Sequence, residues 1–204
     1  MQNEIHQALI AATQKNYEMG KVIYKQVGEE APKINEAQGE ADFYNPRKPM
    51  TTKTISGIGS ITKQFTAATL LKLWDEEITR EKESAKEESI TEEMSFSNGI
   101  DTTFSQFLPR LIAKFPKCEM VFNQFAESEN YAKITLRDLL NHTHELGARN
   151  SRFLAQLMHQ NPDRPLELSE IVESTVSAQN QYGQHHYSNL GYDLAAMIIE
   201  VVTL

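Results

Sequence analysis

The spacing of apolar residues predicts a mostly helical chain that is interrupted near its start by two strands. Apolar residues recur every three or four positions in several segments, as on one face of a helix with 3.6 residues per turn. We expect helices over residues 3–17, 60–77, 134–140, 166–177 and 190–202, and a compact apolar segment over residues 104–115. Lys21–Val27 is rich in β-branched and aromatic residues, and Gly28 can turn it into a weaker second strand near Pro32–Gln38. The pattern therefore predicts one β-hairpin followed by helices.

Charged residues interrupt this apolar pattern between Asp75 and Glu93. The run mixes both signs of charge and has few apolar anchors, which favours a solvated helix extension or a surface insertion. A role in binding a partner stays open. Asn45–Pro49 is expected to be a loop. We expect two regions, residues 1–50 with a helix and the hairpin, and residues 51–204, which are mostly helical and carry the charged run.

The composition of the chain disfavours some classes of binding partner. The formal net charge of −8 and the pI near 5.3 disfavour binding to nucleic acid or to anionic lipid, since both require clustered Lys and Arg. No stretch reaches the roughly 18 consecutive apolar residues of a membrane span. The single cysteine, Cys118, cannot form an internal disulfide, and we expect it to be a packing residue.

The residues at the start of the chain as written, Met1–Gln7, have no basic region and no long apolar run. They are therefore not a secretory signal in this form. The localisation stays open among the cytoplasm, export by another route and trimming from a secreted precursor.

Ser60 and Lys63 form a Ser-x-x-Lys pair at the start of the predicted helix 60–77. A serine hydroxyl is a poor nucleophile until another group takes its proton, and a lysine three residues later on a helix lies close enough to do so. The free backbone N–H groups and the positive end of the helix dipole also lie where negative charge develops on an attacked carbonyl. Such a tetrad is expected by chance roughly once in a chain of this length, so the pair needs support from other segments.

Three segments give that support and follow one another along the chain: Gly57–Ala68 with the Ser60 pair, Thr135–Thr143 with the sequence TLRDLLNHT, and Tyr187–Tyr192 with the sequence YSNLGY. Together they resemble the serine β-lactamase and penicillin-binding-protein family, especially its class C β-lactamase and D-alanyl-D-alanine carboxypeptidase branch. The resemblance implies an α+β fold made of an N-terminal helix, a β-hairpin that is part of an antiparallel sheet, and a helical region.

The resemblance also implies roles for four residues. Ser60 would be the acylated nucleophile, Lys63 its proton acceptor or electrostatic activator, and Tyr187 a phenol that shuttles the proton. Asn189 would hold the substrate through its side-chain amide. A tyrosine acts as a base only where a nearby cation favours its phenolate, so Lys63 and Tyr187 need each other, and the acylation base stays open between them. No cofactor is implied.

Four histidines suggest a different chemistry, because His142, His144, His185 and His186 could be imagined as metal ligands. Their spacings match no established metal pattern, and no cysteine or carboxylate completes a convincing set. We therefore expect no metal site, and we expect His142 to be a hydrogen-bonded loop residue.

Two departures from the family pattern bear on activity. The family continues after His-Thr with Ser-Gly-Leu, whereas this chain has His144–Leu146, so the loop is expected to differ. The chain as written ends at Leu204 and lacks a counterpart of the family's later Lys-Thr-Gly or His-Thr-Gly segment and of three sheet strands. We therefore expect this chain to have little activity by itself and to self-associate through an unpaired sheet edge.

The expected function is acyl transfer from an amide or ester to Ser60, followed by hydrolysis. β-Lactams, D-alanyl peptides and small esters are the open substrate classes. The alternative is a non-catalytic relative that keeps the fold as a binding or host-interaction module, with the charged run as its contact surface. Covalent labelling of Ser60 distinguishes the two.

Overall fold

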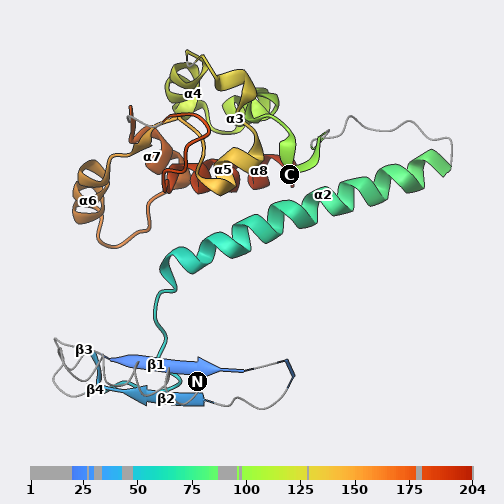
Figure 1. Cartoon of the computed structure of the whole chain (residues 1–204). Helices are drawn as coiled ribbons and strands as arrows, with labels where there is room; N and C mark the ends of the chain where they lie inside the picture. The colour runs from blue at the N-terminus through green and yellow to red at the C-terminus, as the bar shows by residue number, and fades with distance from the viewer. Residues whose placement is uncertain are drawn as a thin grey trace. The chain divides into compact units, whose positions relative to one another are not determined.

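The computed structural model describes residues 20–26, 28–29, 34–42, 48–86, 96, 98–127, 129–177 and 181–203, and the chain divides into two compact units. One unit comprises residues 1–58 and the other residues 59–204 (Figure 1). The helix predicted over residues 3–17 lies outside the described residues.

The predicted hairpin is present in the first unit. Strand β1 (Lys21–Lys25) pairs antiparallel with β2 (Ile34–Gln38), and Lys21 lies opposite Gln38. The described part of the second strand lies within the predicted range 32–38, and residues 32 and 33 lie outside the described residues. Each of the two strands has a single neighbour among the described residues. Pairing of the open edge with another chain stays a prediction.

A second short pair of strands follows the hairpin directly. Strand β3 (Glu40–Asp42) pairs with β4 (Lys48–Pro49) across an irregularity in register, although the sequence analysis expected one hairpin. A Cβ atom at Gly20 would lie 2.3 Å from the backbone oxygen of Glu40, so the close approach of these backbones requires glycine.

The second unit is mostly helical. Its α-helices are α2 (Thr62–Lys86), α3 (Leu108–Lys114), α4 (Glu119–Ala126), α5 (Leu136–Asn141), α6 (Ser151–Gln160), α7 (Leu168–Glu173) and α8 (Leu190–Val202). Its 3₁₀-helices are η1 (Gly59–Ile61), η2 (Gly99–Asp101), η3 (Phe104–Phe107), η4 (Pro116–Cys118) and η5 (Tyr131–Lys133). Two short strands, β5 (Ala148–Arg149) and β6 (Thr175–Val176), pair antiparallel. The chain therefore has the expected α+β fold.

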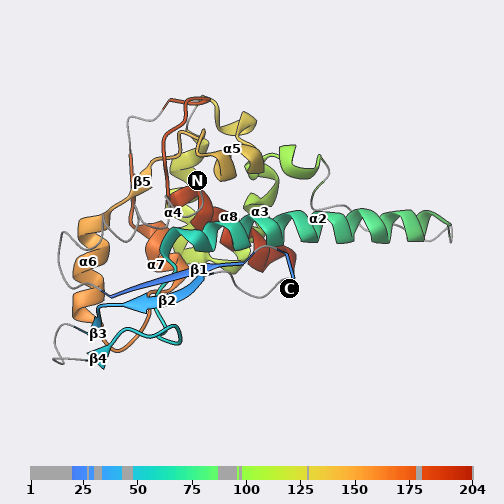
Figure 2. The same ribbon diagram turned by 60° about the horizontal axis from the view of Figure 1, so that its bottom comes forward.

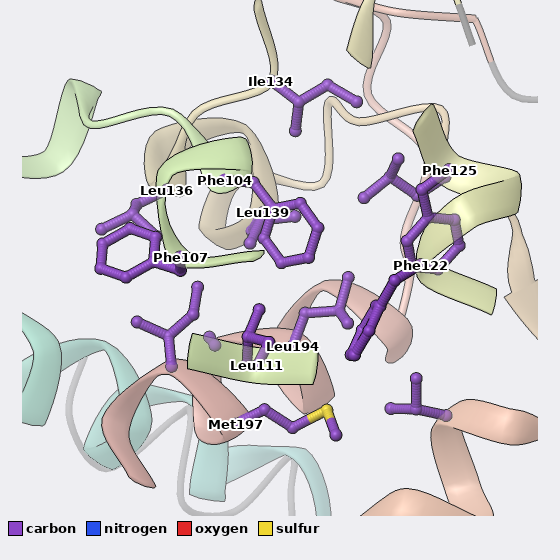
Figure 3. Close-up of a cluster of buried hydrophobic side chains, with 14 of the residues drawn as sticks. Phe104, Phe107, Leu111, Phe122, Phe125, Ile134, Leu136, Leu139, Leu194 and Met197 are labelled. Carbon is purple, nitrogen blue, oxygen red and sulfur yellow. The ribbon is translucent and has the colours of Figure 1, made fainter. Parts of the chain in front are cut away.

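Helix α8 lies at the centre of the second unit, where it contacts α2, α3, α5 and α7 (Figures 1 and 2). Leu194 and Met197 of α8 are fully buried and face a cluster of aromatic and aliphatic side chains (Figure 3). The rings of Phe104 and Phe122 lie 6.5 Å apart between centroids. The same core encloses Cys118, whose side chain is buried as expected. This core fixes α8, and α8 in turn fixes the residues just before it.

Helix α2 extends well beyond the predicted end at residue 77 and runs to Lys86. Its first half lies beside α8, and both views show its second half continuing past the other helices (Figures 1 and 2). The first part of the charged run is thus a helix extension, and residues 87–95 lie outside the described residues. None of the helices in the described ranges combines the length and apolar character that a membrane crossing requires.

The helix predicted over residues 166–177 is shorter than expected, because it ends at Glu173 and strand β6 follows. Two hydroxyl groups explain the early end. The Ser174 hydroxyl donates to the carbonyl of Ile171 at 2.6 Å, and the Thr175 hydroxyl donates to the carbonyl of Val172 at 2.7 Å. These side chains satisfy carbonyls that a longer helix would pair with backbone N–H groups.

Candidate functional site

Ser60 lies in the 3₁₀ turn η1, immediately before α2, so the predicted location of the serine at a helix start is correct. Its hydroxyl oxygen lies 2.7 Å from the phenol oxygen of Tyr187, a hydrogen bond in which either oxygen can donate. Tyr187 belongs to the segment before α8 and is 52% exposed. The structure therefore brings together two residues 127 positions apart.

Lys63 lies in the first turn of α2, and its ammonium group connects the serine to the asparagine. The Lys63 Nζ donates to Asn189 Oδ1 at 2.6 Å and, over a longer distance of 3.4 Å, to Ser60 Oγ. The same Nζ lies over the ring of Tyr187, 5.0 Å from its centroid, and 5.3 Å from the centroid of Tyr192. An ammonium over two aromatic faces is held electrostatically in addition to its hydrogen bonds.

The electrostatics of this cluster favour ionisation of the phenol. The Lys63 ammonium first, and the Ser60 hydroxyl second, hold the pKa of the Tyr187 phenol below its ordinary value, and the Arg149 guanidinium adds to the shift. A cation beside a phenol stabilises the phenolate, because the charged form gains an attraction that the neutral form lacks. The arrangement can therefore accept a proton from Ser60 more readily than an isolated tyrosine could.

Asn189 occupies the N-cap position of α8, but its side chain makes no capping bond and is directed to Lys63 instead. The start of α8 is held tightly against the end of α5. A Cβ atom at Gly191 would lie 2.6 Å from the backbone oxygen of Leu139, and the Tyr192 hydroxyl donates to the Leu140 carbonyl at 3.1 Å. Close backbone packing thus fixes the position of Asn189 relative to Lys63.

His142 is hydrogen-bonded, as the sequence analysis expected, because its Nδ1 accepts from the Ser188 N–H at 3.2 Å. Its ring packs against that of His185, 5.8 Å away between centroids, in an edge-to-face arrangement. His186 is exposed and His144 is buried. Within the part of the chain that the structure describes, no group of three or more His, Cys, Asp and Glu side chains could hold a metal ion.

Sequence reasoning missed an ion pair behind the site. Arg149 of β5 donates two hydrogen bonds to the carboxylate of Asp193 on α8, and these side chains are 29% and 8% exposed. Burial raises the pKa of Asp193, while the Arg149 guanidinium opposes that rise. A carboxylate in the first turn of a mostly apolar helix was the available signal, because buried charges are almost always paired.

His144 provides a prediction on acid stability. The side chain is 1% exposed, its Nδ1 accepts from the Leu146 N–H, and its Nε2 finds no hydrogen-bond partner among the described residues. Burial first, and the neighbouring His142 second, lower the pKa of His144 to about 4. Since the unfolded state keeps a pKa near 6.5, stability is complete above that pH and falls as the pH decreases toward 4. At 1.36 kcal/mol per unit, the loss is about 3 kcal/mol.

Urea unfolding of the wild type and of His144→Leu between pH 7 and pH 4.5 measures this effect. The variant should lose less stability on acidification, because it has no buried imidazole to protonate. The exposed His159 offers a matched control, and His159→Asn should behave as the wild type. Equal pH dependence in His144→Leu and the wild type would contradict the assignment.

The described site thus joins a serine, a lysine, a tyrosine and an asparagine on an α+β scaffold. The family model described as Beta-lactamase matches residues 8–203, and the chain belongs to this β-lactamase family. Neither the comparison with curated proteins nor that with solved structures found a match. Family membership confirms the resemblance to the serine β-lactamase and penicillin-binding-protein family, without specifying a branch, and indicates a serine hydrolase in general.

Proposed function

We propose that the protein is a serine hydrolase in which Ser60 is acylated by an amide or ester substrate and then released by water. The observation that carries the proposal is the 2.7 Å contact between the Ser60 hydroxyl and the Tyr187 phenol, with the Lys63 ammonium beside both. A nucleophile within hydrogen-bond reach of a base, and a third group that activates the base, is the arrangement expected for covalent catalysis.

In the acylation step, the Tyr187 phenolate takes the proton of Ser60 as Oγ attacks the substrate carbonyl. The distances favour Tyr187 as the direct proton acceptor, because Lys63 Nζ is farther from Oγ, at 3.4 Å, and already donates to Asn189. The phenol then returns this proton to the leaving amine or alkoxide as the bond from carbon to the leaving group breaks. Lys63 remains an ammonium throughout and stabilises the phenolate.

Deacylation repeats the sequence with water in place of Ser60. The Tyr187 phenolate takes a proton from the attacking water, the acyl bond to Ser60 breaks, and the proton returns to Ser60 Oγ. Backbone N–H groups at the start of α2 lie beside Ser60 and favour the negative charge that develops on the carbonyl oxygen. Asn189 is proposed to hold the substrate, with Lys63 fixing its side-chain oxygen.

The substrate class follows from the family branch that the sequence resembles, the class C β-lactamases and D-alanyl-D-alanine carboxypeptidases. We propose β-lactams, D-alanyl peptides or small esters as substrates. All three present a carbonyl with a leaving group that needs a proton, which the Tyr187 phenol supplies. None of these steps requires a cofactor.

Covalent labelling tests the proposed function. A fluorophosphonate or a labelled penicillin should attach to Ser60 in the full-length protein, because Ser60 is exposed and its hydroxyl is activated by Tyr187. Peptide mapping by mass spectrometry locates the label. Ser60→Ala should abolish labelling, whereas the matched control Ser56→Ala, which changes another exposed serine, should not. A folded protein that takes no label, or takes it elsewhere, would favour the non-catalytic binding module.

A further inference from the structure

His142 has an unusual backbone conformation for its residue type. It ends α5 with φ 63° and ψ 38°, in the left-handed region, and it is the only residue other than glycine with a positive φ in the described ranges. Histidine and asparagine tolerate this region better than most residues, but it remains uncommon. The conformation turns both the carbonyl and the imidazole of His142 toward the segment that carries Tyr187.

Both peptide neighbours of Tyr187 are held by this one residue. The His142 carbonyl accepts from the N–H of His186 at 2.8 Å, and the His142 Nδ1 accepts from the N–H of Ser188 at 3.2 Å. The imidazole also packs on the Tyr187 ring, with 4.6 Å between centroids and 41° between planes. The backbone before Tyr187, the backbone after it and the face of its ring therefore all contact His142.

We propose that His142 is the positioning residue that holds the Tyr187 phenol on Ser60, and that it does so only while its imidazole is neutral. The role of Tyr187 in catalysis rests on the proposed function, but the contacts of His142 do not. The hydrogen bonds of His142 hold the two peptide neighbours of Tyr187 and its ring packs on the Tyr187 ring, so the proposed role acts through Tyr187.

The requirement for a neutral ring follows from the hydrogen bond to Ser188. Nδ1 can accept only when it carries no proton, so the hydrogen of the neutral ring is on Nε2. A protonated Nδ1 is itself a donor, so it cannot accept from the Ser188 N–H, and the hydrogen bond would be lost. The segment that carries Tyr187 would then keep only one of its two backbone hydrogen bonds to His142.

The surroundings of His142 oppose its protonation. Three groups that carry or can acquire positive charge lie near the His142 ring. They are Lys63 of α2, His185 of the segment before α8, and His144 of the turn after α5. The rings of Tyr187 and Tyr192 also pack against the His142 ring. Burial first, and His185 next, hold the pKa of His142 below its ordinary value. The neutral, positioning form therefore predominates at pH 7, and the protonated form appears only at more acidic pH.

Two substitutions separate the hydrogen bond from other effects. His142→Asn places an amide oxygen where Nδ1 lies, tolerates the left-handed conformation and does not titrate. His142→Gly accepts this backbone conformation without strain but removes both the acceptor and the ring. We expect acylation of Ser60 at pH 7.5 to fall about 10- to 100-fold in His142→Gly, as for a misplaced catalytic group, and to change little in His142→Asn.

The pH profile adds a test that a merely structural role would not pass. As the pH decreases below 6.5, wild-type acylation should fall more steeply than that of His142→Asn. His185→Asn removes the neighbouring imidazole and is the matched control, and its profile should keep the steep fall. Equal acylation of His142→Gly and the wild type at pH 7.5, or equal acid profiles of His142→Asn and the wild type, would overturn the proposal.

A measurement without any substrate tests the positioning contact of His142 independently of the proposed function. In NMR spectra of the full-length protein, the Ser188 amide resonance should move with pH at the same midpoint as the His142 ring resonances. The Ser188 resonance should not follow that titration in His142→Asn. If Ser60 takes no label but Ser188 follows His142, the proposed function fails and the positioning contact stands. If Ser188 does not respond to the titration of His142, the positioning proposal is wrong whatever Ser60 does.

Discussion

Tyr187→Phe and Lys63→Ala should each slow acylation of Ser60 by about 10²-fold or more, which is the usual contribution of a positioned general base. Phenylalanine keeps the ring under Lys63 but removes the oxygen that lies 2.7 Å from Ser60 Oγ. Alanine at position 63 removes the ammonium that favours the phenolate and fixes Asn189. Stopped-flow measurement with a chromogenic ester or β-lactam gives the acylation rate directly.

The double variant makes the prediction sharper. Because Lys63 acts on the proton through Tyr187, the combined loss should be close to that of the worse single variant and far below the product of the two. Tyr182→Phe and Lys72→Ala are matched controls, since both residues hydrogen-bond or pair elsewhere on the same unit. If Tyr187→Phe acylates at the wild-type rate, Tyr187 is only a packing residue. If the loss in the double variant equals the product of the two single losses, Lys63 does not act through Tyr187.

The helices that the sequence predicted best are those with strong local signals. Helix α8 has the bounds expected from its apolar spacing, Leu190–Val202. Helix α5, predicted over residues 134–140, runs from Leu136 to Asn141. Thr135 is its N-cap and forms a capping box with Asp138, whose carboxylate accepts from the Thr135 N–H at 2.9 Å. In both cases the residues that define the element lie within the element itself.

Elements stabilised by distant contacts were not predicted. The sequence analysis also missed helix α6, although Phe153, Leu154, Leu157 and Met158 recur there at helical spacing and its N-cap Asn150 accepts from the Phe153 N–H. The strands β5 and β6 have two residues each and exist because they pair with each other across 25 positions or more. Gly147 allows that pairing, since a Cβ atom there would lie 2.4 Å from the Val176 carbonyl oxygen.

The candidate site shows the same division. The resemblance named Ser60, Lys63, Tyr187 and Asn189, and the structure brings all four within one hydrogen-bonded cluster, while their roles stay proposals. The sequence analysis predicted that His142 is hydrogen-bonded, but it did not predict that His142 contacts both peptide neighbours and the ring of Tyr187. These contacts depend on a left-handed backbone and on two peptide groups more than 40 positions away, and neither is a local property of the sequence.

The first turn of α8 depends on the ion pair between Arg149 and Asp193. The Asp193 N–H bonds to the Asn189 carbonyl at 3.1 Å, so the carboxylate lies one turn after the asparagine that Lys63 contacts. Removing one partner of a buried pair costs about 3 to 5 kcal/mol, because the other charge is left without compensation. Asp193 is the more buried partner, with 8% of its side chain exposed. We therefore expect Arg149→Met to lower the free energy of unfolding by about 3 kcal/mol at pH 7.

The size of this loss should depend on pH and on which partner is removed. Without Arg149, the charge of Lys63 is the main remaining opposition to the rise that burial causes in the pKa of Asp193. The folded state then favours the protonated carboxyl, and the deficit should shrink as the pH decreases toward 4. Asp193→Asn should cost less than Arg149→Met, because Arg149 is partly exposed and water can solvate it. Arg164→Met breaks a more exposed bidentate pair with Glu170 and should cost clearly less than Arg149→Met, because water solvates both charges. Urea unfolding at pH 7 and pH 5 compares the three variants, and an Arg149→Met loss no larger than that of Arg164→Met would show that the pair behind Asn189 does not stabilise the start of α8.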